Sequence, residues 1–477
     1  MNNLTRNISA AAVLLTLASG LTSCNDWLSV QPAQQIEDNE LFTSQTGFKE
    51  ALAGVYSSMV SESSYAKELT FGALAVLANE WDNIPTEYQD LHDYDYSASI
   101  PTGTIANIWS TNYNSIANAN NLLKHIDEQS SLFTGDNYSI IKGEALGLRA
   151  FLHFDLLRCF GVSYAVNSSM PAIPYCTDFT YRVFPQLTVS QVVDRILADL
   201  DEAESLLQAD PIHTGREVTE LDDAGYLINR TVHFNYYAVK ALKARVYMWA
   251  GRYADAYAAA REAYDAPCFT WATQADLSSG DDLSFVNEQI FALNNVNLST
   301  LGDTYFNESS NSRSFSITRD TQFSYYDNET ADYRYLFMYK NGESGDLVDN
   351  RYCTKFTEST ADDSWYHSKM PMIRISEMLL IMAEAQYRTN GSGLDEINEL
   401  RAARNLAPLN VMDEPFLDYL VKEYRRDLIG EGQLFFLLKR LNVTYIPGTD
   451  IDAVAAKNYT FPLPLTETEP AQREPNR

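Results

Sequence analysis

Apolar residues recur at intervals of three and four along most of this 477-residue chain, the spacing that gathers them on one face of an α-helix. The longest stripe of this kind consists of Ile105, Ile108, Trp109, Tyr113, Ile116, Asn120, Leu123 and Ile126. Asn120 interrupts this stripe with an amide, and a buried amide needs hydrogen-bond partners. We therefore expect Asn120 to fasten two helices together.

Two more helices are predicted on either side of a break in the pattern. The first contains Phe151 and Phe154 among leucines and ends at Gly161. Pro171 and Pro174 then interrupt the chain, because proline cannot continue a helix. The second helix is marked by Val189, Val192, Val193, Ile196, Leu200 and Ala203.

A helical repeat is predicted at residues 241–268, ALKARVYMWAGRYADAYAAAREAYDAPC. Small alanines let two antiparallel helices approach closely, and Gly251 turns the chain between them. The residues that match a tetratricopeptide repeat are Ala244, Tyr247, Ala256, Ala260 and Ala263. A weaker second pair is ISEMLLIMAEAQYRTNG followed by LDEINELRAARN.

Such helix pairs bury their apolar faces only by stacking on one another. Pairs that begin near Phe48 with Ile105, and near Tyr138 with Val189, are therefore expected to join the stack. The fold class predicted is mainly α, with tetratricopeptide-like helix pairs stacked at about residues 45–268 and 371–440.

Two stretches lack helical spacing. Residues 80–102 form the first. Residues 269–370 are polar and rich in Gly, Ser, Asn, Asp and Tyr. Because a structureless loop of this length is uncommon in a compact domain, we expect an irregular, loop-rich subdomain inserted between the repeats.

The N-terminus has the pattern of an export signal. Residues 8–21 are an apolar run of 14 residues behind Arg6, too short to cross a bilayer and typical of a signal peptide. The following Leu-Thr-Ser-Cys resembles the bacterial lipobox, in which the cysteine is lipidated and becomes the first mature residue. We expect a signal peptide at 1–23, a mature domain at 24–477 and acyl chains on Cys24 that anchor it to a membrane. The alternative is ordinary cleavage that leaves Cys24 free.

The composition is that of a globular protein, with 45% apolar residues and a net charge of −29. Nucleic-acid binding needs clustered Lys and Arg, which the sequence lacks, so nucleic acid is excluded as a partner. The other four cysteines match no zinc pattern, and their disulfide state stays open: Cys159, Cys176, Cys268 and Cys353.

Several segments, in order, resemble the SusD/RagB family of outer-membrane nutrient-binding lipoproteins of Bacteroidetes. They are SCNDWLSVQP, WSTNYNSIANANNLL from Trp109, IIKGEALGLRAFLHFDLLRCFG from Ile140, RISEMLLIMAEAQYRTNG with INELRAARN, EYRRDLIGEGQLFFLLKRLN from Glu423, and NYTFPLPLTETE from Asn458. Gln433 and Leu437 depart from the C-terminal signature, where Arg and Asp are common, which indicates a subgroup.

The resemblance implies a surface-exposed lipoprotein of the outer membrane that captures oligosaccharide and delivers it to a TonB-dependent transporter. It also implies that the repeats contact the transporter and that ligand binds on the irregular face. Within the same uptake system, the alternative ligand is a peptide. From other classes, the alternatives are a helical-repeat scaffold without a ligand, and an exported hydrolase.

Sugar rings have an apolar face and a rim of hydroxyl groups, so the candidate ligand-binding residues are aromatic and polar side chains in polar segments. Trp81 in the sequence EWDN is the first candidate, as an exposed aromatic platform. The full set is Trp81, Asp82, Asn83, Tyr88, Tyr94, Tyr96, Trp271, Tyr325 and Trp365, with Tyr305, Tyr326 and Tyr366 as further aromatics of the insertion. The alternative for each is local packing, and Trp109 and Trp249 are expected in the core.

Charged residues within helices are interpreted as ion pairs that join repeats rather than as functional groups. These are Glu144, Arg149, Arg401, Glu423 and Glu431. Neither a hydrolase motif nor a nucleotide-binding motif occurs, so we expect no enzyme activity and no cofactor. SGDDLS at Ser279 lacks the ligand spacing of a calcium loop and is interpreted as a turn, and no metal site is expected.

Overall fold

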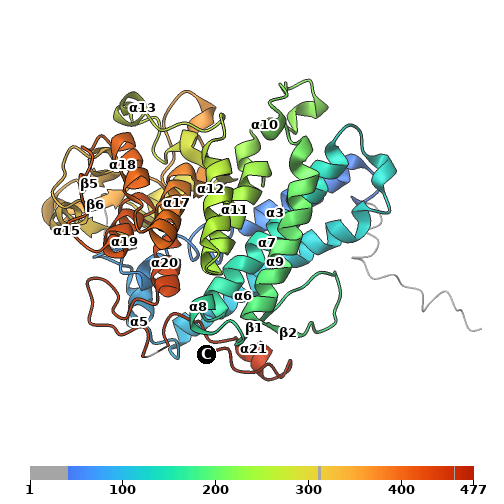
Figure 1. Ribbon diagram of the computed structural model, residues 1–477, viewed down its shortest axis with the longest axis horizontal. Helices are drawn as coiled ribbons and strands as arrows, with labels where there is room; N and C mark the ends of the chain where they lie inside the picture. Colours follow the sequence, from blue (N-terminus) through green and yellow to red (C-terminus); the bar gives the residue numbers. More distant parts are fainter. Residues whose placement is uncertain (1–40, 310–312, 456) are drawn as a thin grey trace, which may run out of the picture.

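The computed structural model of the protein describes residues 41–309, 313–455 and 457–477. The predicted signal peptide and Cys24 lie outside the described residues. The fold is mainly helical, as predicted (Figure 1). The helices are α3 (Gln45–Met59), α4 (Ala73–Leu77), α5 (Gln89–His92), α6 (Ser99–Ile126), α7 (Asn137–Phe160), α8 (Tyr164–Asn167), α9 (Val189–Leu206), α10 (Pro211–Thr214), α11 (Tyr236–Trp249), α12 (Tyr253–Tyr264), α13 (Gln274–Ser279), α14 (Leu298–Tyr305), α15 (Arg319–Tyr325), α16 (Tyr333–Phe337), α17 (Ile375–Asn390), α18 (Leu394–Ala403), α19 (Phe416–Asp427), α20 (Gln433–Leu441) and α21 (Leu465–Thr468).

The strands are short and pair in three small antiparallel sheets, ordered β1-β2, β3-β7 and β4-β6-β5. They are β1 (Pro171–Pro174), β2 (Gln186–Thr188), β3 (Gln289–Asn294), β4 (Ile317–Thr318), β5 (Tyr339–Asn341), β6 (Asn350–Cys353) and β7 (Lys369–Arg374). Most of these strands, together with α13 to α16, fall within residues 269–370, where the elements are all short.

The long helices pack side by side in the order that the sequence predicts. Helix α6 contacts α3 and α7, α7 contacts α9, α12 contacts α11 and α17, and α17 contacts α18. Figure 1 shows this row of helices across the middle of the molecule, with α15, β5 and β6 at its left-hand side. The two pairs expected to join the stack, α3 with α6 and α7 with α9, are confirmed.

The alanine-rich pair α11 and α12 owes its close packing to small side chains. Ala244, Ala256, Ala260 and Ala263 are all fully buried. Gly251 turns the chain between the two helices with a φ of +73°, a left-handed conformation that glycine adopts without steric cost.

Asn120 fastens helices together as predicted. Its side-chain N–H donates to the carbonyl of Cys176 at 3.0 Å, and its side-chain oxygen accepts from Arg149 of α7 at 3.0 Å. Arg149 in turn forms two 2.7 Å bonds to Asp199 of α9. One polar chain therefore joins three neighbouring helices, and the interpretation of Arg149 as a structural pair is confirmed.

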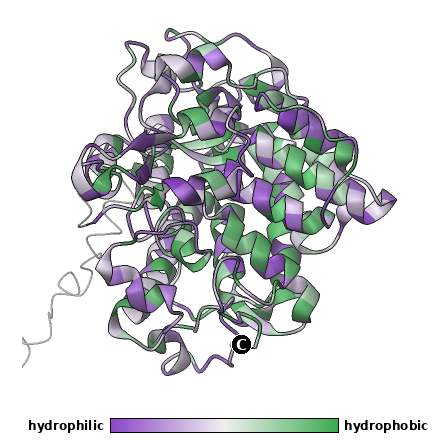
Figure 2. Cartoon of the chain, turned by 90° about the vertical axis from the view of Figure 1, so that its left-hand side faces the viewer, coloured by the Kyte–Doolittle hydropathy of each residue, from purple (hydrophilic) through white to green (hydrophobic). Residues whose placement is uncertain are grey.

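The repeat helices carry apolar and polar residues in alternating patches, as Figure 2 shows by hydropathy. Their apolar sides join one continuous core that includes Trp109 and Trp249, the two tryptophans expected there. No helix in the described ranges has the combination of length and hydrophobicity that a membrane crossing requires. The four cysteines of these ranges are free thiols.

Candidate ligand-binding site

Trp81 is in the core, so the expectation of an exposed Trp81 platform is wrong. Its side chain is 3% exposed and packs near Phe306 and Phe315, with ring centroids 5.9 and 6.0 Å away. Its indole N–H donates to the carbonyl of Phe71 at 2.9 Å. Both Phe306 and Phe315 come from the insertion, which covers a segment that has no apolar periodicity of its own.

The three tyrosines that follow Trp81 are buried too, which corrects their expected exposure. The hydroxyl of Tyr88 donates to Glu68 at 2.9 Å, and those of Tyr94 and Tyr96 donate to backbone carbonyls. A buried tyrosine needs a partner for its hydroxyl, and each of these has one. Burial raises the pKa of all three hydroxyls well above the usual value.

Asp82 and Asn83 hold the loop that contains them against the insertion. The Asn83 backbone pairs with Ser316, and its side-chain N–H donates to the Ser316 hydroxyl at 3.0 Å. Asp82 is exposed, and its carboxylate accepts from the backbone N–H of Thr318 at 2.5 Å, the residue that caps the N-terminus of α15. The structure therefore brings Asp82 to the start of α15, whereas the side chain of Asn83 is engaged in packing the loop.

Tyr325 lies at the other end of α15 and is half-buried. Its hydroxyl donates to the carbonyls of Asn79 and Glu80, both at 3.3 Å, and the Arg425 guanidinium lies 4.9 Å from its ring centroid. Burial raises the pKa of the Tyr325 hydroxyl to about 12, although Arg425 opposes the shift. The Tyr325 hydroxyl thus links α15 to residues 79–80, which directly precede Trp81 and Asp82 in the chain.

An open hollow of about 590 Å³ lies along α15, and we call it the α15 hollow. It is lined by Asp320, Phe323, Ser324, Asp327 and Asn328, of which only the Phe323 ring is half-buried. None of these five residues is among the ligand-binding residues predicted from the sequence. The sequence feature that indicates them is a Phe among Asp, Ser and Asn residues in the polar insertion, the same pattern that predicts the other candidates.

Glu80, next to Trp81 in the chain, is fully buried. One carboxylate oxygen accepts from the backbone N–H of Gly430 at 2.6 Å, and the other has no hydrogen-bond partner in the described structure. Burial raises the pKa of Glu80 to about 7, although the Gly430 N–H and Arg425 oppose the shift.

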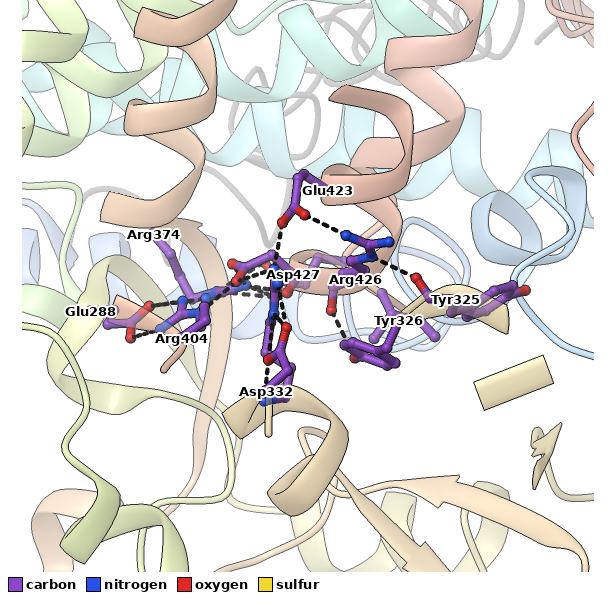
Figure 3. A network of polar contacts seen from close by, with 12 residues as sticks. Glu288, Tyr325, Tyr326, Asp332, Arg374, Arg404, Glu423, Arg426 and Asp427 are labelled. Atoms are coloured by element: carbon purple, nitrogen blue, oxygen red, sulfur yellow. Dashed lines mark hydrogen bonds and ion pairs between the residues drawn. The ribbon is translucent and has the colours of Figure 1, made fainter. Parts of the chain in front are cut away.

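A buried ionic network holds α15 against the repeat helices (Figure 3). Arg426 of α19 donates to the Tyr325 carbonyl, and the Tyr326 hydroxyl donates back to the Arg426 carbonyl at 3.3 Å. Arg426 is held in turn by Glu423 at 2.7 Å. Burial alone would raise the pKa of Glu423, but Arg334 and Arg426 lower it to about 2. Contacts with α19 therefore fix the position of α15, which is a short helix.

The same network continues through the insertion and confirms the structural interpretation of the helical charges. Arg404, the C-cap residue of α18, forms two 2.7 Å bonds to Glu288 and one of 2.8 Å to Asp427. Arg374 of β7 bridges Glu288 and Glu431. The other predicted pairs also have structural partners, Glu144 with Arg230 and Arg401 with Glu329.

Trp271 and Trp365 lie apart from the α15 hollow and flank Asn287. The Trp365 indole N–H donates to the Asn287 side chain at 2.9 Å, and the backbone N–H of Thr270, next to Trp271, donates to the Asn287 carbonyl at 3.0 Å. Lys369 lies 3.3 Å from the Trp365 ring centroid, and burial lowers its pKa to about 8. Both tryptophans are half-buried, so part of each ring faces solvent.

The three further aromatic residues of the insertion differ in their exposure to solvent. Tyr305 and Tyr326 are buried, and Tyr366 is half-buried. The SGDDLS segment forms a turn in which Asp282 accepts from the backbone N–H groups of Ser284 and Val286. Within the described residues, no group of three or more His, Cys, Asp or Glu side chains is placed to hold a metal ion.

Comparison with known proteins agrees with this architecture. Residues 26–248 match the family described as "Starch-binding associating with outer membrane", and residues 289–472 match the "SusD family". A SusD-like protein P38 of Formosa agariphila is 23% identical over 96% of this chain and 96% of its own length.

Solved structures share the fold. A SusD superfamily protein from Bacteroides thetaiotaomicron superposes with a TM-score of 0.72 at 20% identity, over 91% of this chain and all of the other. The surface glycan-binding protein A from Bacteroides uniformis does so with a TM-score of 0.66 at 18% identity, over 91% of this chain and 99% of the other.

Stacked helix pairs that carry an insertion of short helices and strands define a helical-repeat protein. The chain belongs to the SusD/RagB family, because its two family matches together span nearly all of the sequence behind the signal segment. The resemblance seen in the sequence motifs is confirmed.

Proposed function

We propose that this protein is a lipid-anchored, surface-exposed binding protein of the outer membrane. In this proposal it captures oligosaccharide at the α15 hollow and delivers it to a TonB-dependent transporter. The observation that carries the proposal is the α15 hollow itself, where the Phe323 ring lies among exposed polar side chains of residues 320–328. The family description, starch binding and association with the outer membrane, supports the same class of ligand.

The chemistry of the α15 hollow suits a sugar. The Phe323 ring offers an apolar surface for one face of a pyranose, and Asp320 and Asn328 offer acceptors and donors to the hydroxyl rim. Aromatic and carboxylate side chains in a shallow, open site are suited to one segment of a long polymer, because the rest of the chain can extend beyond both ends. Such a site captures ligand without enclosing it.

The repeat helices are the side proposed to face the transporter. They stack in a row that extends away from α15, which is at the left-hand side of the molecule, so part of this row is available to a protein partner while the α15 hollow holds ligand (Figure 1). Lipid on Cys24, which lies outside the described residues, would keep the protein at the membrane that contains this transporter.

The test is a glycan and peptide array followed by calorimetry with the ligand that the array selects. Phe323→Ala and Asp320→Ala should each weaken binding, the ring substitution by about 1–3 kcal/mol by analogy with stacking on planar ligands. Asp346→Ala is the matched control, since Asp346 is an exposed acid of the same subdomain that does not line the hollow. Selective binding of peptides would replace oligosaccharide as the ligand, and binding of neither class would leave the scaffold alternative.

A further inference from the structure

A second, larger concavity lies away from the α15 hollow. It is a cleft of about 820 Å³ between α6, the 175–185 loop that joins β1 to β2, and the C-terminal segment 466–473, and we call it the α6 cleft. Figure 1 shows β1, β2, α21 and the C-terminus together at the lower end of the molecule, whereas α15 is at the left-hand side. The two sites share no lining residue.

The wall formed by the 175–185 loop is fixed to α6 by side chains of that helix. The Tyr113 hydroxyl donates to the carbonyl of Pro174 at 2.8 Å, and the Asn120 side chain donates to the carbonyl of Cys176 at 3.0 Å. Both contacts are at the base of the loop. The start of the loop is therefore fixed against α6, and the residues that follow form one wall of the cleft.

The opposite wall is fixed to the far end of the same loop. Arg473 donates to the carbonyl of Phe184 at 3.1 Å and pairs with Glu467 at 2.6 Å. The side chain of Gln186 exchanges two hydrogen bonds with the backbone of Glu474. Because both ends of the loop are anchored, the space between the walls is part of the fold and not a gap left by a loose segment.

Aromatic residues line this space on two sides. On α6, the ring centroids of Trp109 and Tyr113 lie 4.7 Å apart. In the loop, Phe179 and Phe184 are half-buried. Tyr181, at the tip of the loop, is 99% exposed. Because the protein does not cover the Tyr181 ring, the ring is available to stack on a ligand at the mouth of the cleft.

The polar groups of the α6 cleft favour an uncharged ligand. Arg473 and Glu467 neutralise one another, and the exposed charges that remain are of both signs: Lys124, Asp178 and Arg182. Thr180 and Thr466 add hydroxyl groups. Aromatic faces with a mixed rim of donors and acceptors match the apolar faces and hydroxyl edges of sugar rings, and the volume is within the usual range of small-ligand sites.

We propose that the α6 cleft is a second binding site, for a segment of a neutral oligosaccharide, separate from the α15 hollow. This inference rests on the proposed function, since it assigns the same class of ligand to both sites. Two sites on one chain would hold a long glycan more tightly than either alone, because binding at one raises the effective concentration at the other.

The experiment is titration calorimetry of the mature chain with four defined neutral probes: maltohexaose, cellohexaose, xylohexaose and laminarihexaose. A probe that binds should do so at two sites per chain. Tyr181→Ala should weaken one of the two sites by roughly 5- to 150-fold, the equivalent of one aromatic stacking contact. Ala117→Trp, which places a large ring on the cleft-lining surface of α6, should remove that site without removing any existing contact.

Tyr445→Ala is the matched control, because Tyr445 is an exposed tyrosine that does not line the cleft. Phe323→Ala should weaken only the other site, at the α15 hollow. Binding that Phe323→Ala abolishes and that neither Tyr181→Ala nor Ala117→Trp changes would overturn the α6 cleft and leave the proposed function standing. Absence of binding by all four probes would overturn both, and selection of peptides instead would overturn the assignment of oligosaccharide to the cleft.

Discussion

Replacement of Trp81 by alanine tests whether burial or sequence context decides the role of this residue. The side chain is 3% exposed and its N–H bonds to the Phe71 carbonyl, so truncation leaves a cavity against Phe306 and Phe315 and an unpaired carbonyl. Removal of a buried tryptophan costs about 3–5 kcal/mol. At about 2.1 cal/mol/K of unfolding entropy per residue over roughly 430 residues, this corresponds to a fall in Tm of about 3–6 °C.

The assay is a calorimetric melt of the wild type, Trp81→Ala and Trp81→Phe, with glycan affinity measured well below each Tm. Trp81→Phe keeps a ring but leaves the Phe71 carbonyl unpaired, so it should lose about 1–3 kcal/mol, less than the alanine variant. An unchanged Tm together with lost affinity would show that the indole faces ligand, and the argument from burial would then be refuted.

Three further substitutions test other parts of the structure. The pKa of Glu80 in the folded protein is about 7, above its ordinary value of 4.5, so the stability that its protonated form contributes is lost as pH rises from about 4.5 to about 7. Glu80→Gln should remove this pH dependence and raise the free energy of unfolding above pH 7 by up to about 3 kcal/mol. The measurement is a series of melts across that pH range. Ala260→Trp should overpack the α12 contact at a cost of about 1–3 kcal/mol or more, whereas Ala258→Trp on the exposed side of the same helix should leave the Tm unchanged, and equal melting of both variants would contradict the buried position. Cys24→Ala should release the protein from the membrane fraction or leave an unprocessed precursor, and acyl labelling of that variant would speak against the lipid anchor.

The candidate site shows where inference from the sequence stops. Composition predicts a site in the polar segment around Asp82 and in the aromatic insertion, and the structure does bring Asp82 to the start of α15, the helix that contains Tyr325. The exposure predicted for Trp81 is wrong, because no periodicity in its own segment indicates that Phe306 and Phe315 cover it. The α6 cleft was not foreseen at all, since Trp109 and Tyr113 are part of an ordinary helical stripe.

The sequence by itself determined the helical repeats. Apolar spacing, small alanines at α11 and α12 and the turn at Gly251 act between near neighbours in the chain, so their consequences can be worked out locally. Only the tertiary structure decided which aromatic rings are covered and which side chains share a concavity. Those properties depend on contacts between segments hundreds of residues apart, such as Arg473 with Phe184 or Asp82 with Thr318, and no local pattern encodes them.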